Sequence, residues 1–183
     1  MYAHDAHTIS EPDVLARWGY SEVINSHSEN CYADVPNINE IRKKRESGMP
    51  CSALTQDERR ALAIACTNCR PVLTNFLAGI TRFQLKPVGR QYVGALLVAP
   101  CVWHPESKGE FVRFAEWVDI PPLTDHPADA RNVICRPLYE PPTDALAIGR
   151  HNANPVLVDG FHRAVALWRC AALGALLQAY VPV

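Results

Sequence analysis

The sequence predicts an α/β fold, more finely α+β, in which helices flank a mixed β-sheet. Its 183 residues are 48% hydrophobic and 20% charged, which is ordinary for one globular domain with a sizeable core. Thr55-Gln56-Asp57-Glu58 is a helix-starting capping box, and apolar residues follow it at helical spacing. Near the other end, the apolar run Val156-Leu157-Val158 leads through a glycine into a second helical pattern. Helix and strand signals therefore alternate along the chain.

Helices are predicted early in the chain. The first, a short one, begins near Pro12, behind Ser10 or Glu11, because proline favours the first turn of a helix. A second, short helix lies between Asn37 and Gly48. The third follows Thr55, and its apolar positions recur at helical spacing, which places two cysteines on its buried face: Leu62, Ala65, Cys66 and Cys69.

Strands are predicted from residue 81 onward. Residues 81–86 alternate between apolar and polar side chains, and Tyr92 to Val102 is a nearly continuous apolar run typical of a strand buried on both faces. Phe111 to Val118 is predicted as a further strand, and Leu176 to Val183 as the closing one. Prolines between residues 121 and 142 predict loops in that stretch.

The chain is expected to form one domain over residues 1–183. Residues 1–100 would be a helical and strand N-terminal region of unknown role, and residues 101–183 would carry the chemistry. A net charge of -1 excludes the strongly basic proteins that hold duplex DNA through many phosphate contacts. No apolar run approaches the ~20 residues that span a bilayer, and the start lacks a secretory signal pattern. We expect a cytoplasmic protein without a transmembrane segment.

Seven cysteines are scattered through the chain, an odd number that does not indicate a disulfide framework, so reduced thiols are expected. Cys66-x-x-Cys69 could be half a zinc site or a redox pair. No second Cys-x-x-Cys or His-x-x-x-His follows at ligand spacing, so buried structural cysteines without a metal are favoured.

The basic run Arg42-Lys43-Lys44-Arg45 allows two interpretations. It could contact nucleic-acid phosphates. Four cations at the end of a short helix are more often a solvated face that compensates the helix dipole, and this second interpretation is favoured.

The segment that carries chemistry begins where the strand at 156–158 ends at Asp159 and Gly160. A helix is expected from about Gly160 to Leu173, with His162 and Arg163 in its first turn. The free N–H groups and the positive dipole end of such a helix attract an anion. Cations in the first turn are unfavourable unless something negative offsets the dipole, as a phosphate would. The competing interpretation is that Asp159 only caps the helix.

This block resembles the ParB/sulfiredoxin-like superfamily, in which a strand, a Gly-x-His-Arg or Gly-Glu-Arg-Arg type turn and a helix surround nucleotide phosphates. The resemblance covers Phe111 to Val183 and leaves the first ~100 residues unexplained. Sulfiredoxins carry a catalytic cysteine where this chain has Phe161, so peroxiredoxin repair is not expected. Chromosome-partitioning members follow this module with a helix-turn-helix domain, which is not recognised after the closing strand here, so a centromere-binding role is not expected.

A small chain of this type resembles the plasmid fertility-inhibition factors. That resemblance implies an ATPase and DNase, a hydrolase that blocks DNA transfer through conjugative type IV secretion. Its ligands would be ATP or another nucleotide, DNA and Mg²⁺. A type IV secretion or DNA-processing protein would be its partner, and could hold it at the inner membrane.

In that interpretation Gly160, Phe161, His162 and Arg163 bind the nucleotide. Arg163 would stabilise charge on the phosphoryl oxygens, His162 would donate a proton, and Asp159 would orient the turn or help to hold a metal. Glu116 and Asp119, at the end of the 111–118 strand, would bind Mg²⁺ or activate water, unless they are merely exposed strand-end acids. Arg163 should point outward, so that its removal abolishes nucleotide binding without unfolding the protein.

Two other functions stay open. One is an inhibitory binding protein that uses nucleotide only as a switch. The other is a small-molecule kinase of the free-serine type, which would need Glu116 on its strand. Arg150 and His151, which precede the motif strand, were further candidates for reaching the same pocket.

Overall fold

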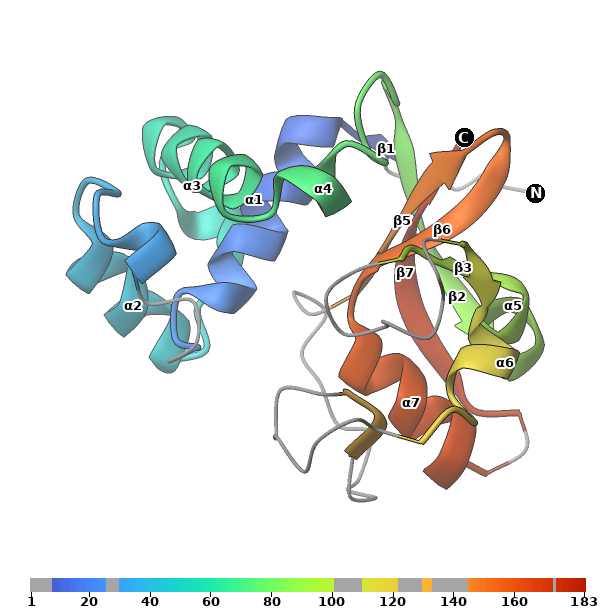
Figure 1. Cartoon of the computed structure of the whole chain (residues 1–183). Helices are drawn as coiled ribbons and strands as arrows, with labels where there is room; N and C mark the ends of the chain where they lie inside the picture. The colour runs from blue at the N-terminus through green and yellow to red at the C-terminus, as the bar shows by residue number, and fades with distance from the viewer. Residues whose placement is uncertain (1–7, 26–29, 101–109, 122–129, 133–144, 173) are drawn as a thin grey trace, which may run out of the picture.

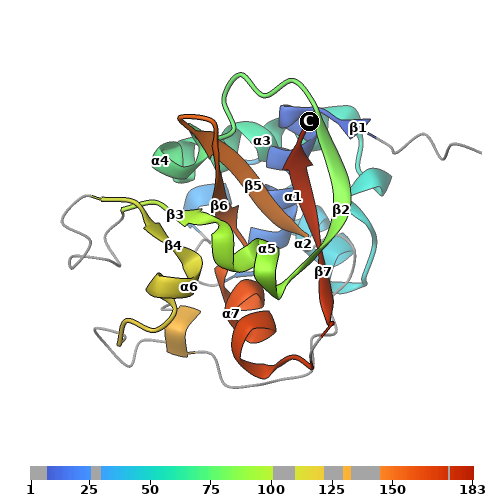
Figure 2. The same cartoon turned by 90° about the vertical axis from the view of Figure 1, so that its right-hand side faces the viewer.

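The computed structural model describes residues 8–25, 30–100, 110–121, 130–132, 145–172 and 174–183. Its centre is a mixed β-sheet with helices on both faces (Figures 1 and 2). Helices α1 and α3 lie on one side of the sheet, and α5, α6 and α7 on the other. The predicted α/β class, a mixed sheet flanked by helices, is confirmed.

The described part of the sheet has seven strands in the order β1-β2-β7-β5-β6-β3-β4. β7 is parallel to β5 and β3 is parallel to β6, whereas the remaining neighbours are antiparallel. The strands span Thr8–Ile9 (β1), Phe83–Gly89 (β2), Leu97–Val98 (β3), Val112–Arg113 (β4), Leu146–His151 (β5), Asn154–Asp159 (β6) and Leu176–Pro182 (β7). Strands from before and after residue 100 therefore belong to one sheet, and β3 pairs with strands from after residue 100 on both of its sides.

The early helices begin where their capping residues predict. α1 (Glu11–Glu22) starts behind Ser10, whose side chain accepts a hydrogen bond from the Asp13 N–H. α2 (Ile38–Glu46) starts behind Asn37, and α3 (Gln56–Cys69) starts with the complete capping box of Thr55. A short α4 (Pro71–Thr74) and a 3-10 turn (Cys51–Ala53) complete this region. All three predicted helices are confirmed.

Two predicted strands are wrong in most of their length. Tyr92 to Val102 contains α5 (Arg90–Ala95) and then only the two residues of β3, while residues 101–102 lie outside the described part. Phe111 to Val118 contains the two-residue β4 and then α6 (Phe114–Trp117). The buried residues explain both: Val93 and Leu96 are three apart, and Phe114, Trp117 and Val118 recur at i, i+3 and i+4. One apolar face at helical spacing was read as an apolar strand.

The C-terminal predictions hold. β6 contains the 156–158 run inside the sheet, and α7 (Phe161–Cys170) follows it directly. The helix ends before the predicted Leu173, which lies outside the described residues. β7 is the predicted final strand, although it pairs between β2 and β5 rather than at an edge.

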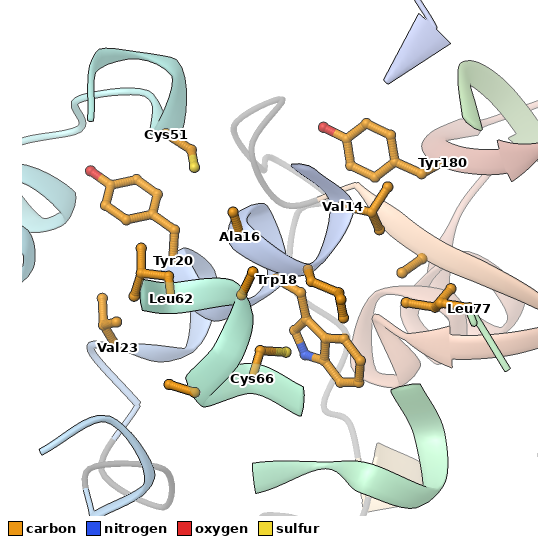
Figure 3. Close-up of a cluster of buried hydrophobic side chains, with 14 of the residues drawn as sticks. Val14, Ala16, Trp18, Tyr20, Val23, Cys51, Leu62, Cys66, Leu77 and Tyr180 are labelled. Carbon is orange, nitrogen blue, oxygen red and sulfur yellow. The ribbon is translucent and has the colours of Figure 1, made fainter. Parts of the chain in front are cut away.

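Apolar side chains alternate across the central strands and build a core on each face. Ala147 and Val158 join the core under α1 and α3, part of which is drawn in Figure 3. Leu146, Ile148 and Leu157 join the core under α5 to α7. Because β5 and β6 are buried on both faces, the chain that leaves β6 enters the protein interior at Asp159.

In the described part of the chain, no helix is both long and apolar enough to cross a bilayer.

Any larger residue at Gly149 in β5 should destabilise the protein, because the neighbouring backbone leaves no room for a side chain. A Cβ atom there would clash with the Phe76 carbonyl oxygen and lie 2.7 Å from its carbonyl carbon. Neither backbone atom can turn aside, because the Phe76 carbonyl accepts from the Arg150 N–H at 2.8 Å. We expect Gly149→Ala to cost about 1 to 3 kcal/mol in urea unfolding.

Gly89→Ala is the matched control. A Cβ atom on Gly89 would meet the Leu176 side chain at 3.4 Å and the Ala175 carbonyl oxygen at 3.9 Å, both ordinary contact distances, and Gly89 has an extended backbone that any residue adopts. The urea-unfolding midpoint of Gly89→Ala should stay close to that of the wild type. Equal midpoints for the two variants would contradict the close approach of the Phe76 backbone to β5.

Candidate phosphate site at the β6–α7 turn

The turn between β6 and α7 has the geometry that the sequence predicts. β6 ends at Asp159, Gly160 takes a φ of 90°, and the ten-residue α7 begins at Phe161. No side chain of Gly160 can cap α7, and the first helical bond in this turn runs from the Ala164 N–H to the Gly160 carbonyl at 2.9 Å. A left-handed φ of this kind favours glycine. The turn therefore presents the N-terminus of a helix.

Protein side chains occupy the space next to Gly160 where a Cβ atom would stand. A Cβ atom on Gly160 would clash with the Leu146 side chain and lie 2.8 Å from Nη2 of Arg163. The glycine is thus required by its φ and by these two side chains. The arrangement differs from one in which the missing side chain lets a ligand approach the backbone.

Arg163 folds back onto Asp159. Its Nη2 donates to Oδ2 of Asp159 at 3.2 Å, and the two side chains are only 13% and 18% exposed. The prediction that Arg163 points outward is wrong. The sequence offered a signal for this pair, because oppositely charged residues four apart meet on one side of a helix start. Asp159 also supplies the negative charge that the first turn of α7 needs.

The Asp159 carboxyl is electrostatically costly. Burial raises its pKa above the ordinary value, because desolvation penalises the charged form more than the Arg163 guanidinium favours it. The Gly160 N–H also donates to this carboxylate and favours its ionised form. In such surroundings the ionised form of a carboxyl group is stabilised only by its partners. Carboxyl groups with perturbed pKa values are often found at functional sites.

The helical region contributes charges that sequence analysis missed. Arg70, just after α3, pairs with Glu22 at the end of α1 at 3.3 Å between Nη2 and Oε2. Both side chains act electrostatically on Asp159: Glu22 raises its pKa and Arg70 lowers it. Glu22 and Arg70 are 48 residues apart in the chain, so no local pattern could have joined them.

Phe161 and His162 have different environments. The Phe161 ring packs edge-on against Trp117, 5.5 Å between centroids, and therefore anchors the start of α7 to α6. His162 is exposed beside it. Of the predicted binding residues, His162 is the one whose side chain meets solvent most freely.

Glu116 and Asp119 are exposed, but neither lies at the end of a strand. Glu116 belongs to α6, beside the Trp117 that packs on Phe161, and Asp119 follows that helix. The described residues bring no three His, Cys, Asp or Glu side chains together around one metal position. A pre-formed Mg²⁺ site from these acids is thus not found in that part of the chain.

Arg150 and His151 lie at the far end of β5 from the turn, because Ala147 pairs with Asp159 whereas His151 pairs with Asn154. Five residues of strand separate the two ends, roughly 16 Å. The His151 ring stacks on Phe111 with 4.1 Å between centroids. The expectation that these residues reach the pocket is wrong.

The basic run is engaged within the helical region. Arg42 donates to the Val23 carbonyl, Lys43 pairs with Glu40, Lys44 pairs with Glu58, and Arg45 lies over the Tyr20 ring. These contacts support the favoured interpretation, a local face of α2, over a phosphate-binding surface.

The cysteines depart from expectation. Cys69 is half-buried and forms a disulfide with Cys31, and Cys170 is also disulfide-bonded. Cys66 is fully buried and free, as predicted. The expectation of reduced thiols is wrong for Cys31, Cys69 and Cys170. Disulfides are typical of oxidising compartments, which weighs against a cytoplasmic location.

Comparison of the chain with protein-family models, curated proteins and solved structures gives no match. The function must be argued from the β6–α7 turn.

The ion pair at the turn should be visible in stability. Arg163→Ala leaves the Asp159 carboxylate half-buried without its guanidinium, which should cost ~2 kcal/mol in urea unfolding. Asp159→Ala should cost less than Arg163→Ala, because arginine can extend to water. The double variant should lose less than the sum of the two, with a coupling energy of about 1 kcal/mol. A double variant whose stability loss equals the sum of the two single losses would show that Arg163 and Asp159 do not interact.

Asp159 should also leave a mark on the pH dependence of stability. Its raised pKa means that the folded chain binds more protons than the unfolded chain between about pH 4, the unfolded value, and the raised value. The contribution of Asp159 to stability therefore falls as pH rises through this window. We expect the stability of Asp159→Asn relative to the wild type to rise as the pH of urea titrations increases from about 4. A difference independent of pH would argue against a raised pKa.

Proposed function

We propose that this chain binds the phosphate groups of a nucleotide or of DNA at the N-terminus of α7, and that Arg163 exchanges Asp159 for the phosphate when the ligand arrives. The observation that carries the proposal is the Arg163–Asp159 pair at 3.2 Å over a glycine turn that opens a helix. An arginine that pairs with a carboxylate at a helix N-terminus can exchange it for a second, stronger anion.

The binding energy would come from two sources. The first-turn N–H groups of α7 and its dipole favour an anion, as at other helix N-termini. The Arg163 guanidinium makes charge-assisted hydrogen bonds to phosphate, in a fork that suits its oxygens. His162, exposed in the same turn, can donate a further hydrogen bond.

Asp159 would act as the resident anion. In the ligand-free state its carboxylate accepts from Gly160 and from Arg163, and so offsets the dipole of α7. A phosphate must compete with this carboxylate for Arg163. Once Arg163 has left, the buried carboxyl takes up a proton more readily, because desolvation already raises its pKa. Phosphate binding would thus be linked to proton uptake.

The finer proposal follows the resemblance to ParB/sulfiredoxin-like proteins and plasmid fertility-inhibition factors. The ligand would be ATP or DNA, with hydrolysis of a phosphate ester and inhibition of DNA transfer through a type IV secretion partner. Arg163 would then stabilise charge on phosphoryl oxygens and His162 would supply a proton. Mg²⁺ that arrives on nucleotide phosphates needs only one or two protein carboxylates, for which Glu116 is the candidate, since it precedes the Trp117 that packs on Phe161 of α7.

A non-catalytic switch is the second candidate, and the Arg163–Asp159 pair favours it specifically. A pair that opens for a ligand and closes without it provides two states, and two states suffice for an inhibitory binding protein. A free-serine kinase loses its support, since Glu116 lies on α6 and not on a strand. Release of inorganic phosphate from ATP and nicking of plasmid DNA separate hydrolysis from switching.

The test measures ATP affinity by calorimetry for two variants that break the same ion pair. Arg163→Ala should abolish binding. Asp159→Asn removes the competing anion and should tighten binding about tenfold, which is ~1.4 kcal/mol. Loss of stability cannot explain opposite changes in affinity, because both variants break the pair.

Lys86→Ala removes an exposed cation from β2, three strands from β6, and serves as the charge control. Its affinity should equal that of the wild type. The proposal is overturned if Arg163→Ala binds ATP as tightly as the wild type, or if Lys86→Ala weakens binding as much as Arg163→Ala does. Weaker binding by Asp159→Asn would instead show that Asp159 helps to hold the ligand or its metal.

A further inference from the structure

Two cysteines lie in the last turn of α3, and one of them is bonded to a third cysteine. Cys69, the last residue of α3, is bonded to Cys31 across 38 residues of sequence. Cys66 lies one helical turn earlier and keeps a free thiol that is fully buried. The Cys66-x-x-Cys69 spacing thus combines one bonded and one free sulfur.

The backbone at this point allows Cys66 to approach Cys69. Residues three apart on a helix have Cβ atoms about 5 to 6 Å apart, whereas a disulfide needs about 3.5 to 4.5 Å. α3 ends at Cys69, and Arg70 has left the helix with φ -128° and ψ 48°. The last helical bond at this end joins the Arg70 N–H to the Cys66 carbonyl. Loosening one terminal turn would close the gap.

Cys66 shares its core cluster with the neighbour of the second bonded cysteine. Tyr32, which follows Cys31 in the chain, is fully buried in the same cluster as Cys66, and it lowers the pKa of the Cys66 thiol. Cys31 itself is exposed, at the surface of this part of the chain. In Figure 3 the Cys66 side chain lies in the core beneath α1, beside Trp18.

We propose that Cys66 is an internal nucleophile for the Cys31–Cys69 disulfide, so that the chain exchanges this disulfide for a Cys66–Cys69 disulfide. The Cys66 thiolate attacks Sγ of Cys69, the Cys66–Cys69 bond forms, and the Cys31–Cys69 bond breaks. Cys31 leaves as a thiolate and takes up the proton that Cys66 gave up. One disulfide and one thiol are present before and after, so the step needs no oxidant or reductant.

The environment of Cys66 makes the exchange slow at neutral pH. Burial raises the pKa of the Cys66 thiol, and only the thiolate attacks. The groups that act on this thiol come from four places: Tyr32 before α2, Asp159 in β6, Glu22 in α1 and Arg70 after α3. Asp159 and Glu22 raise the pKa further, whereas Tyr32 and Arg70 lower it.

Exchange would also reach the candidate phosphate site, although the proposal does not rest on phosphate binding. Release of Cys31 frees the segment that carries Tyr32 from α3. Closing a Cys66–Cys69 bond reshapes the helix end that positions Arg70 against Glu22, the ion pair that acts on Asp159. The disulfide is thus placed to act as a switch for this cluster.

The test maps free thiols in the oxidised full-length protein. Samples kept at about pH 7, 8 and 9 without added thiol are quenched in acid, unfolded, alkylated and analysed by peptide mass spectrometry. Cys66 should be alkylated at the start, and alkylated Cys31 should replace it one for one with time. The initial rate should rise about tenfold per pH unit without levelling off, because the Cys66 pKa is raised.

Two variants serve as controls. Cys51, the other described free thiol, is buried in the same core cluster as Cys66 but is not part of the Cys66-x-x-Cys69 pair, so Cys51→Ser should leave the exchange unchanged. Cys66→Ser should abolish it. The proposal is overturned if Cys31 stays unalkylated at every pH in wild-type protein, or if it becomes alkylated equally fast in Cys66→Ser. The wild-type experiment decides the question even if Cys66→Ser does not fold.

Discussion

The burial of strands β5 and β6 on both faces is the constraint on which the rest of the structure depends. Ala147 and Val158 turn toward α1 and α3, while Leu146, Ile148 and Leu157 turn toward α5, α6 and α7. Two helical layers can cover one sheet only if its central strands carry apolar side chains on both faces. Strands contributed by both halves of the chain then flank this centre, which makes a single sheet from segments distant in sequence.

The same constraint creates the chemistry at Asp159. A strand that is buried on both faces ends inside the protein, so a polar residue at its last position is poorly solvated. Arg163 and the Gly160 N–H compensate in part for the lost solvation of the Asp159 carboxylate, yet burial still raises the pKa of Asp159. The helical region closes over this point with the Glu22–Arg70 pair and with Cys66. Charge, thiol and helix N-terminus are therefore coupled in one place, which links the proposed phosphate exchange to the proposed disulfide exchange.

The sequence predictions are confirmed where they depend on interactions between residues that are near in the chain. Ser10 and Thr55 cap helices through hydrogen bonds to residues three positions away, and both helices begin where expected. The strand, glycine turn and helix at residues 154–170 also follow from adjacent residues. The apolar runs at 92–102 and 111–118 failed because periodicity alone cannot separate a short buried helix from a strand. Their buried positions, such as Phe114 and Trp117, follow the helical period once the structure is known.

The sequence by itself determined the helix starts, the β6–α7 turn and the presence of Asp159, His162 and Arg163 around a glycine, because each depends on neighbours within one or two helical turns. Only the tertiary structure decided what surrounds that turn. Glu22 and Arg70 meet across 48 residues, and Cys31 and Cys69 are joined across 38. Such partners are brought together by packing α1 and α3 on the sheet. No local spacing records which buried charges or sulfurs become neighbours, since burial is a property of the whole core.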